Sequence, residues 1–245
     1  MKIDRMTEAI IRDLWSRVEP RIREAKTLEE GAQTLATELY TQFAESVVLA
    51  RVFVTAPFDA LPADVGTFVE TLVKSAGRPA SLRGPVPVVS LVGTQGQEAA
   101  WNDRRNSRRH QGIPLISSSF VAAIPMIARL FRDLGVPLEW IDSDDAEHFA
   151  TAVGHSAGLF FVRDAATAVD DHGRTIIAPD FVSAYGIKTV FGAGGAYARG
   201  QLLVIVIFCR DDVPRTTAEQ CLHLAELFKG QTASLMEARR VFEAA

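Results

Sequence analysis

Hydrophobic residues recur at spacings of three and four at both ends of the chain, and this period predicts amphipathic helices there. The first predicted helix covers residues 7–25, and Pro20 inside it predicts a kink or a break. The second begins at Thr27, which has the capping-box spacing with Glu30, so that each side chain satisfies a backbone N–H at the helix start. The third covers residues 215–243.

Short apolar runs rich in β-branched residues predict strands between these helices. The predicted strands are 46–55, 86–94, 158–163, 188–192 and 201–209, and further helices are predicted over 64–75 and over 120–134, the latter with Pro125 in its first turns. The sequence GAGG, Gly192 to Gly195, is predicted to form the turn that follows the fourth of these strands.

The terminal helix carries a seam with a seven-residue period, which is typical of a helix that packs against another helix. The members of the seam are Cys221, Ala225, Phe228, Thr232, Leu235, Arg239 and Phe242. The seam fits either packing on the chain's own domain or contact with a second subunit. Because both ends of the chain offer amphipathic helices, we expect a homodimer that forms through the terminal helices.

The closing block, residues 180–229, contains a short amphipathic run, a strand, a glycine-rich turn, a long apolar strand and a helix. This order resembles the C-terminal half of GAF domains, and residues 27–60 resemble an earlier part of the same family more loosely. Pieces of the region 75–155 are similar to uncharacterised bacterial GAF-like proteins. The resemblance implies an α+β fold with a GAF/PAS-like antiparallel sheet. One face of that sheet carries helices, and the other is covered by loops and short helices that often form a ligand pocket.

We interpret residues 1–245 as a single GAF-like domain, because no linker divides the chain cleanly. It comprises an N-terminal helix within 1–26, an insertion-rich region at 75–155 and a C-terminal helix within 215–245. The resemblance implies a sensory or regulatory domain of bacterial signal transduction that binds a small molecule, with a signalling protein as a further candidate partner. The sequence specifies neither the ligand nor a cofactor.

Three specialised activities of GAF domains do not fit the residues of this chain. Bilin attachment needs a cysteine in the pocket helix, and neither Cys209 nor Cys221 has that position. The NKFDE-like motif of cyclic-nucleotide-binding members is missing from the sequence, and the reduction of methionine sulfoxide needs more cysteines than two.

The densest polar cluster is the segment WNDRRNSRRH, from Trp101 to His110. Guanidinium groups bind carboxylates and phosphates through paired donors, so the cluster is a candidate clamp for an anionic ligand. The indole of Trp101 offers a stacking surface beside it. The alternative is that these arginines are solvated or form ion pairs with some of the 30 acidic residues of the chain. The candidate ligand-binding residues here are Trp101, Arg104, Arg105, Arg108 and His110.

Aromatic residues flank the predicted strands of the second half of the chain. Most of them are expected in the core, but Tyr185 and Tyr197 have hydroxyls that suit a pocket rim. Phe161 lies within the predicted strand 158–163, and His155 comes shortly before it. Ligand pockets combine apolar walls with a few polar anchors. We therefore add His155, Phe161, Tyr185 and Tyr197 to the candidate ligand-binding residues.

Alternative chemistries rest on shorter patterns. The sequence GHSAG around Ser156 matches the nucleophile elbow of hydrolases, but the apolar strand follows the serine, whereas the elbow requires it before the serine. His148, His155 and a neighbouring aspartate could hold a metal only if a helix brings them to one face. A phosphate loop at GAGG should precede a helix, and here a strand follows. The glycines more simply permit a bulge or a close approach of backbone or ligand near the end of the strand. A hydrolase that uses Ser156 and a ligand-free interaction module are the alternatives to a sensor.

Composition narrows the setting of the protein. The chain has 48% hydrophobic and 23% charged residues and a formal net charge of -4, which gives no electrostatic case for nucleic acid or a membrane surface. The longest apolar run, residues 202–209, is far shorter than the about 20 residues that span a bilayer. Because the chain has only two cysteines, Cys209 and Cys221, we expect a reduced, cytoplasmic compartment. We expect no membrane partner either.

Overall fold

Six antiparallel strands form the central sheet of the protein, in the order β3-β2-β1-β6-β5-β4. The computed structural model describes residues 1–77, 82, 84–107, 110–142 and 157–243. The strands are β1 Val47–Pro57, β2 Pro87–Gly96, β3 Gly112–Pro114, β4 Ala157–Val162, β5 Thr189–Ala196 and β6 Leu202–Cys209. The expected α+β fold with an antiparallel sheet is confirmed, and the short edge strand β3 is an element that the apolar pattern did not predict.

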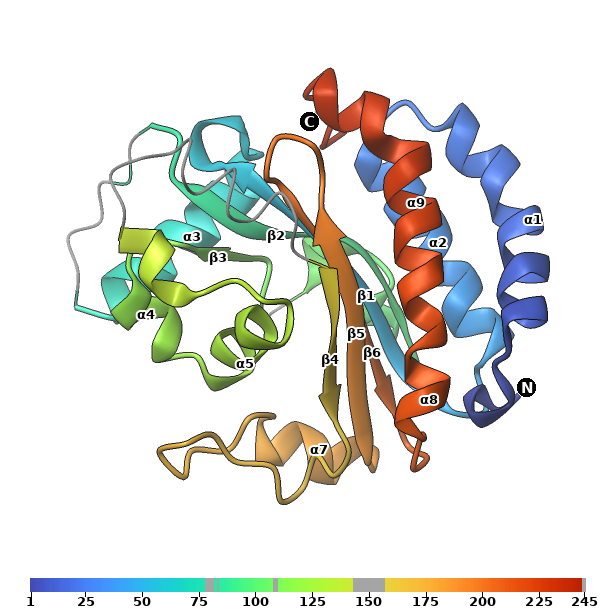
Figure 1. Cartoon of the computed structure of the whole chain (residues 1–245). Coiled ribbons are helices and arrows are strands. Elements are labelled where there is room, and N and C mark those ends of the chain that lie inside the picture. The colour runs from blue at the N-terminus through green and yellow to red at the C-terminus, as the bar shows by residue number, and fades with distance from the viewer. Residues whose placement is uncertain (78–81, 83, 108–109, 143–156, 244–245) are drawn as a thin grey trace.

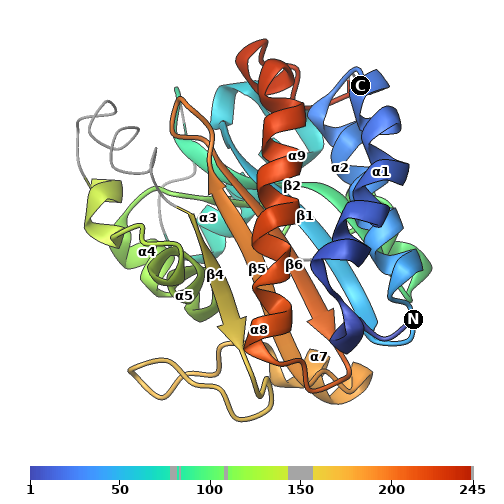
Figure 2. The same ribbon diagram turned by 45° about the vertical axis from the view of Figure 1, so that its right-hand side comes forward.

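Three long helices cover one face of the sheet, which we call the helix face (Figure 1). They are α1 Glu8–Glu24, α2 Leu28–Gln42 and α9 Gln220–Glu237. Figure 2 shows α9 lying along the sheet with α1 and α2 beside it. The opposite side, the loop face, carries α4 Ser118–Ala122, α5 Pro125–Asp133 and α7 Pro179–Tyr185, and α3 Ala63–Ser75 packs beside β3. Shorter elements are η1 Ile3–Arg5, η2 Phe58–Ala60, η3 Ala99–Trp101, η4 Arg104–Asn106, η5 Leu138–Asp142 and α8 Arg215–Ala218.

Both faces of the central strands are apolar and buried, so the sheet lies between two hydrophobic layers. Strands β5 and β6 are buried at every position. This two-sided burial explains why the sequence shows continuous apolar runs there and no alternation of apolar and polar residues. Within the described parts of the chain, no helix is long and apolar enough to cross a bilayer.

The N-terminal helices follow their sequence signals closely. Helix α1 runs without interruption through Pro20, so the predicted break at this residue is wrong. The Thr7 hydroxyl accepts a hydrogen bond from Ile10 N at 3.4 Å. The Thr27 hydroxyl likewise accepts one from Glu30 N at 3.2 Å. The return half of the predicted capping box is different, because the Glu30 carboxylate accepts from Lys26 N instead of from the capping residue.

Prolines and glycines account for two corrections to the predicted elements. Pro125 begins α5 and separates it from α4, so the predicted helix over 120–134 is two helices. Gly192 to Gly195 lie inside β5, so this segment is a strand and the predicted turn there is wrong. A Cβ at Gly192 or Gly194 would lie 2.6 or 2.3 Å from a backbone oxygen of β6, so the glycines allow two strands to approach closely. The actual turn is at 197–201, with Gly200 at a φ of 82°.

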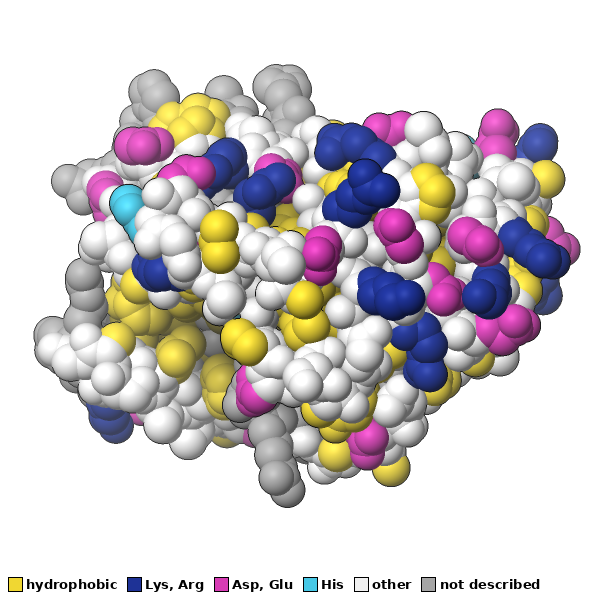
Figure 3. All heavy atoms as spheres, turned by 90° about the horizontal axis from the view of Figure 1, so that it is seen from below, with side chains coloured by type: hydrophobic (Ala, Val, Ile, Leu, Met, Phe, Trp, Pro, Cys, Tyr) yellow, Lys and Arg dark blue, Asp and Glu magenta, His cyan; other side chains and the backbone are white. Residues whose placement is uncertain are grey.

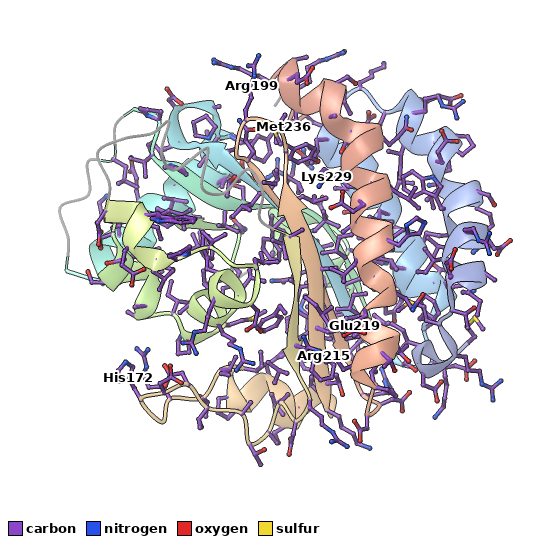
Figure 4. The ribbon with its side chains drawn as sticks, viewed as in Figure 1. His172, Arg199, Arg215, Glu219, Lys229 and Met236 are labelled. Atoms are coloured by element: carbon purple, nitrogen blue, oxygen red, sulfur yellow. The ribbon has the colours of Figure 1, made fainter. Side chains whose placement is uncertain are left out.

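The terminal helix is shorter than predicted, and its seam faces inward. It is divided into α8 and α9 and ends at Glu237, so Arg239 and Phe242 lie beyond it. The other five members of the seam are buried against the helix face of the chain's own domain. Figure 4 shows how α8 and α9 span the sheet, with Arg215 and Glu219 at one end and Met236 at the other, near Arg199.

Helix α2 approaches the sheet closely at Gly93 of β2. A Cβ there would lie 2.4 Å from the Ala32 carbonyl oxygen in α2. We predict that Gly93→Ala lowers the free energy of unfolding by about 1–3 kcal/mol, because backbone atoms must move to accept the methyl group. Urea unfolding followed by circular dichroism measures this loss.

Gly66 is the matched control, because it lies in α3 and a Cβ there meets nothing within 4 Å. Gly66→Ala should raise the free energy of unfolding by about 0.5–1 kcal/mol through the helix preference of alanine. Equal effects of the two substitutions would contradict the close packing of α2 on β2.

Candidate functional site

Trp101 and Tyr185 are the two predicted ligand residues that the structure brings together. Their ring centroids lie 4.7 Å apart in an edge-on arrangement, and Phe181 packs against both rings. Both side chains are half-buried at the margin of the loop-face core. Gly96 leaves room for this cluster, since a Cβ there would lie 2.7 Å from the indole of Trp101.

Phe161 and Tyr197 lie on the opposite side of the sheet from this aromatic cluster. Phe161 packs on the helix-face core, with the guanidinium of Arg215 5.7 Å from its ring centroid. Tyr197 is buried, and its hydroxyl lies 2.8 Å from the Thr232 hydroxyl of α9. The predicted residues therefore do not surround one pocket, and a ligand contact of Phe161 or Tyr197 stays a prediction.

Arg104 and Arg105 form ion pairs within the chain. Arg104 is buried, and its Nε donates to Glu29 Oε1 at 2.7 Å while its Nη1 donates to Asp64 Oδ2 at 3.0 Å. Arg105 is partly exposed, with Nη1 3.1 Å from the same Glu29 oxygen and Nη2 3.0 Å from Glu243 Oε2. The ion-pair interpretation therefore describes both side chains here, and the anion clamp stays a prediction.

Several further candidates lie outside the described residues. They are Arg108, His155, the serine of the GHSAG motif (Ser156), and His148 with its acidic neighbours. His110 is described, is half-buried and has a φ of 60°, and its role in binding stays a prediction. Among the residues that the structure describes, no three His, Cys, Asp or Glu side chains are grouped so that they could hold a metal ion.

Another arginine, Arg51, is buried on the loop face of the sheet. Arg51 lies in the middle of β1 and is only 7% exposed. Its neighbours along the strand, Leu49 and Phe53, belong to the loop-face core, and the alternation of a strand puts Arg51 on that face with them. Arg51 Nη2 donates a hydrogen bond to the Ser107 hydroxyl at 3.1 Å. Burial lowers the pKa of Arg51 to about 10, so the guanidinium still carries its charge at neutral pH.

Thr94 completes a buried polar patch around this guanidinium. It pairs directly with Arg51 across β1 and β2, so the two side chains share the loop face. Thr94 is fully buried, and its hydroxyl forms no hydrogen bond within the described structure. We call Arg51, Thr94 and Ser107 the Arg51 patch. A buried hydroxyl without a partner costs about 1–3 kcal/mol, so the patch is a place where a polar ligand or a water gains hydrogen bonds.

The segment 97–107 lies beside β2 and covers the patch. It includes η3 and η4, and Ser107 directly follows η4. The main chain of Thr94 is held from the other side by Gln33 of α2, whose amide donates to Thr94 O at 2.9 Å and accepts from Thr94 N at 3.1 Å. The strand is thus fixed, and the covering segment is the part that must move if a ligand is to reach Arg51.

Arg51 was not predicted as a candidate residue, because a single charge does not form a cluster in the sequence. The available signal was a single arginine within the apolar run VVLARVFV of β1. A buried strand is stable without an arginine, and an arginine is rarely buried unless it is paired with another group or binds a ligand.

A separate groove of about 400 Å³ lies on the outer surface between α1 and α9. It is lined by half-buried Trp15 and Leu227 together with Glu19, His223 and Glu226, and it contains no residue of the Arg51 patch.

The view of the molecule from below shows a second feature. Hydrophobic side chains gather there in a hollow on the loop side of the sheet (Figure 3).

The two thiols offer no reactive nucleophile. Cys209 and Cys221 are both buried, and burial raises the pKa of Cys221 to about 12 and that of Cys209 well above its usual value. Since the thiolate is the reactive form of cysteine, neither group is available for covalent chemistry at neutral pH.

Comparison with solved structures finds GAF domains among the similar folds. The phycoerythrobilin-bound GAF domain of a cyanobacterial phytochrome has 12% sequence identity and a TM-score of 0.49, with 93% of this chain and 97% of that chain covered. Another structure described simply as a GAF domain has 14% identity and a TM-score of 0.49, with 94% and 92% covered. Free methionine-R-sulfoxide reductase from Neisseria meningitidis in complex with its substrate has 10% identity and a TM-score of 0.47, with 94% and 93% covered.

No protein-family model matches the sequence, and no curated protein matches it. The described chain itself has the arrangement that the resemblance to GAF domains implied. An antiparallel sheet carries long helices on one face, and short helices and loops cover the other.

Measurements of the free energy of unfolding test whether Arg51 and Arg104 contribute differently to stability. We predict that Arg51→Met lowers the free energy of unfolding by less than Arg104→Met does, because Arg51 donates to a neutral hydroxyl whereas Arg104 is paired with two carboxylates. Arg104→Met should lower it by about 3 kcal/mol, because Glu29, at 4% exposure, loses its buried counter-charge. Both values come from chemical denaturation.

A loss for Arg51→Met as large as that for Arg104→Met would show that Arg51 is a structural residue. Arg12→Met provides the control for loss of a surface charge. Arg12 forms an exposed ion pair with Glu8 at 3.8 Å, so a change of less than about 0.5 kcal/mol is expected.

Proposed function

We propose that this protein is a ligand-binding sensory domain of bacterial signal transduction, located in the cytoplasm, and that its ligand is a small anion-bearing molecule held at the Arg51 patch. The observation that carries the proposal is a charged guanidinium, 7% exposed, inside the apolar layer of the loop face. A guanidinium presents five donors in a planar fork that fits a carboxylate or a phosphate. The Thr94 hydroxyl beside it supplies a further hydrogen-bonding group.

The surroundings of the patch support a ligand with an apolar part. Val206 of β6 pairs with Arg51 on the other side of β1, and Leu49 and Phe53 flank it along the strand. Pockets for small molecules combine such apolar walls with a few polar anchors that fix orientation. The ligand class that fits best is therefore a small organic carboxylate or phosphate ester.

The described conformation is the closed one for this function. Arg51, Thr94 and Ser107 are all buried, so a ligand reaches the guanidinium only after the segment 97–107 moves away from it. A site that must open reports ligand binding through the segment that moves, which is what a sensory domain requires.

Thermal unfolding against a panel of small carboxylates and phosphate monoesters tests the proposal. We predict that at least one compound raises the melting temperature of the natural sequence and that Arg51→Met abolishes the shift. A ligand present at 100 times its Kd stabilises the folded state by about 2.7 kcal/mol, which such a measurement resolves easily.

Arg12→Met is again the control, since it removes one positive charge far from the patch and should leave the shift intact. A compound that stabilises the natural sequence and Arg51→Met equally would place binding elsewhere. If no compound of the panel stabilises the natural sequence, the anionic ligand class is wrong.

We also propose that two copies associate through the exposed sides of α1 and α9. The seam of α9 is buried within the domain, so the surface available is the groove that contains Trp15 and Leu227. Light scattering coupled to size-exclusion chromatography should give twice the chain mass for the natural sequence and the single mass for Leu227→Glu. Glu237→Gln, at an exposed position outside the groove, should remain dimeric. A single mass for the natural sequence at high concentration would refute the dimer.

A further inference from the structure

The last described residues of the chain cap the start of α2, a helix from the opposite end of the sequence. Helix α9 ends in a tight turn in which Arg240 N donates to Leu235 O at 2.9 Å and Arg239 adopts a φ of 56°. This turn sends the chain across the N-terminus of α2, at the end of the molecule where Figure 4 labels Met236. We call residues 238–243 the tail.

The tail satisfies backbone donors that a helix start leaves unpaired. Leu28 N and Glu29 N, the first two of α2, each donate to a tail carbonyl, those of Arg240 and Val241, at 2.9 Å. In return, Glu243 N donates to Glu29 Oε2 at 3.0 Å. The tail is therefore bound by main-chain hydrogen bonds in both directions.

The same carboxylate connects the tail to the segment that closes the Arg51 patch. Glu29 Oε1 accepts from Arg104 and is paired with Arg105, two residues of η4. Arg105 also bonds the tail directly through Glu243, and the Arg104 guanidinium lies 5.5 Å from the ring centroid of Phe242. Segment and tail thus share one set of ion pairs.

The connection ends at Arg51. Ser107 lies two residues after Arg105, and its hydroxyl accepts the hydrogen bond from Arg51 Nη2. A shift of η4 away from α2 would therefore act on the tail at one side and on the Arg51 patch at the other. The distances join the patch to the tail through contiguous contacts between named groups.

We propose that the tail is a releasable clasp that holds the segment 97–107 closed over the Arg51 patch, so that opening of the patch and release of the tail are linked. The inference rests on the proposed function in taking the patch as the ligand site, but the linkage itself belongs to the chain without ligand. Coupling between two sites is reciprocal. A ligand that opens the patch favours the released tail, and loss of the clasp favours the open patch.

Trypsin measures the clasp directly, because Arg239 and Arg240 lie within the tail. Cleavage after Arg240 needs an extended, released main chain, and the Arg240 carbonyl is hydrogen-bonded when the tail is docked. The loss of residues 241–245 is followed by mass spectrometry of the intact protein under native conditions. Cleavage should be slow in the natural sequence and several-fold faster in Arg105→Ala, which removes the ion pairs with Glu29 and Glu243.

The decisive variant is Ser107→Ala, which touches the patch and not the tail. If the clasp and the patch are linked, loss of the Arg51–Ser107 hydrogen bond speeds cleavage after Arg240 by up to about fivefold, the equivalent of one net hydrogen bond. Glu237→Gln is the matched control, since it changes an exposed carboxylate next to the tail and should leave the rate unchanged. Circular dichroism verifies that each variant is folded.

An unchanged cleavage rate in Ser107→Ala, with Arg105→Ala faster, would show that the tail is merely a local cap and would overturn the linkage. Equal rates in Arg105→Ala and the natural sequence would overturn the clasp itself. Inorganic phosphate separates this proposal from the proposed function. If phosphate stabilises the protein through Arg51 without speeding tail cleavage, the ligand site stands and the linkage is overturned. If Ser107→Ala and Arg105→Ala release the tail while no anion binds, the linkage stands and the ligand class fails.

Discussion

The carboxylate of Glu29 is the point on which the arrangement of this molecule depends. It lies in the first turn of α2, where the helix dipole favours a negative charge, and it is only 4% exposed. A buried carboxylate requires charged and hydrogen-bonding partners. Those partners come from η4 and from the tail, so one group joins the second helix, the segment beside β2 and the end of the chain. Elements that are distant in sequence are held together because this single charge has to be compensated.

Local signals predicted the fold wherever a short stretch of chain decides its own structure. Thr27 caps α2 as its spacing with Glu30 indicated, and the apolar runs became β1, β2, β4 and β6. Predictions were wrong where distant contacts decide. Gly192 to Gly195 read as a turn, yet pairing with β4 and β6 on both sides makes them a strand. The terminal helix continues in sequence pattern to Phe242, but α9 ends at Glu237 because the tail bonds to α2.

The candidate site was harder to predict than the fold, for an electrostatic reason. In the sequence, the arginines after Trp101 form the obvious anion site, because charge density is visible in a linear chain. Their partners Glu29 and Asp64 are separated from Arg104 by 75 and 40 residues, so no local pattern reveals that the charge of Arg104 is already compensated. Arg51 is the reverse case. It is isolated in an apolar strand, and only the folded structure shows that it lies beside Thr94 and under Ser107.

The two buried arginines, Arg51 and Arg104, differ in the partners that hold them. Arg104 lies against two carboxylates, and a charge compensated in this way fixes structure, because removing either partner leaves the other buried alone. Arg51 donates a hydrogen bond to the Ser107 hydroxyl on the loop face, and this bond joins β1 to the segment that follows β2. An anion bound at Arg51 would add a charged acceptor to this guanidinium. Because Ser107 and Arg105 belong to one short segment, such an anion would act on the same contacts that hold the tail against α2.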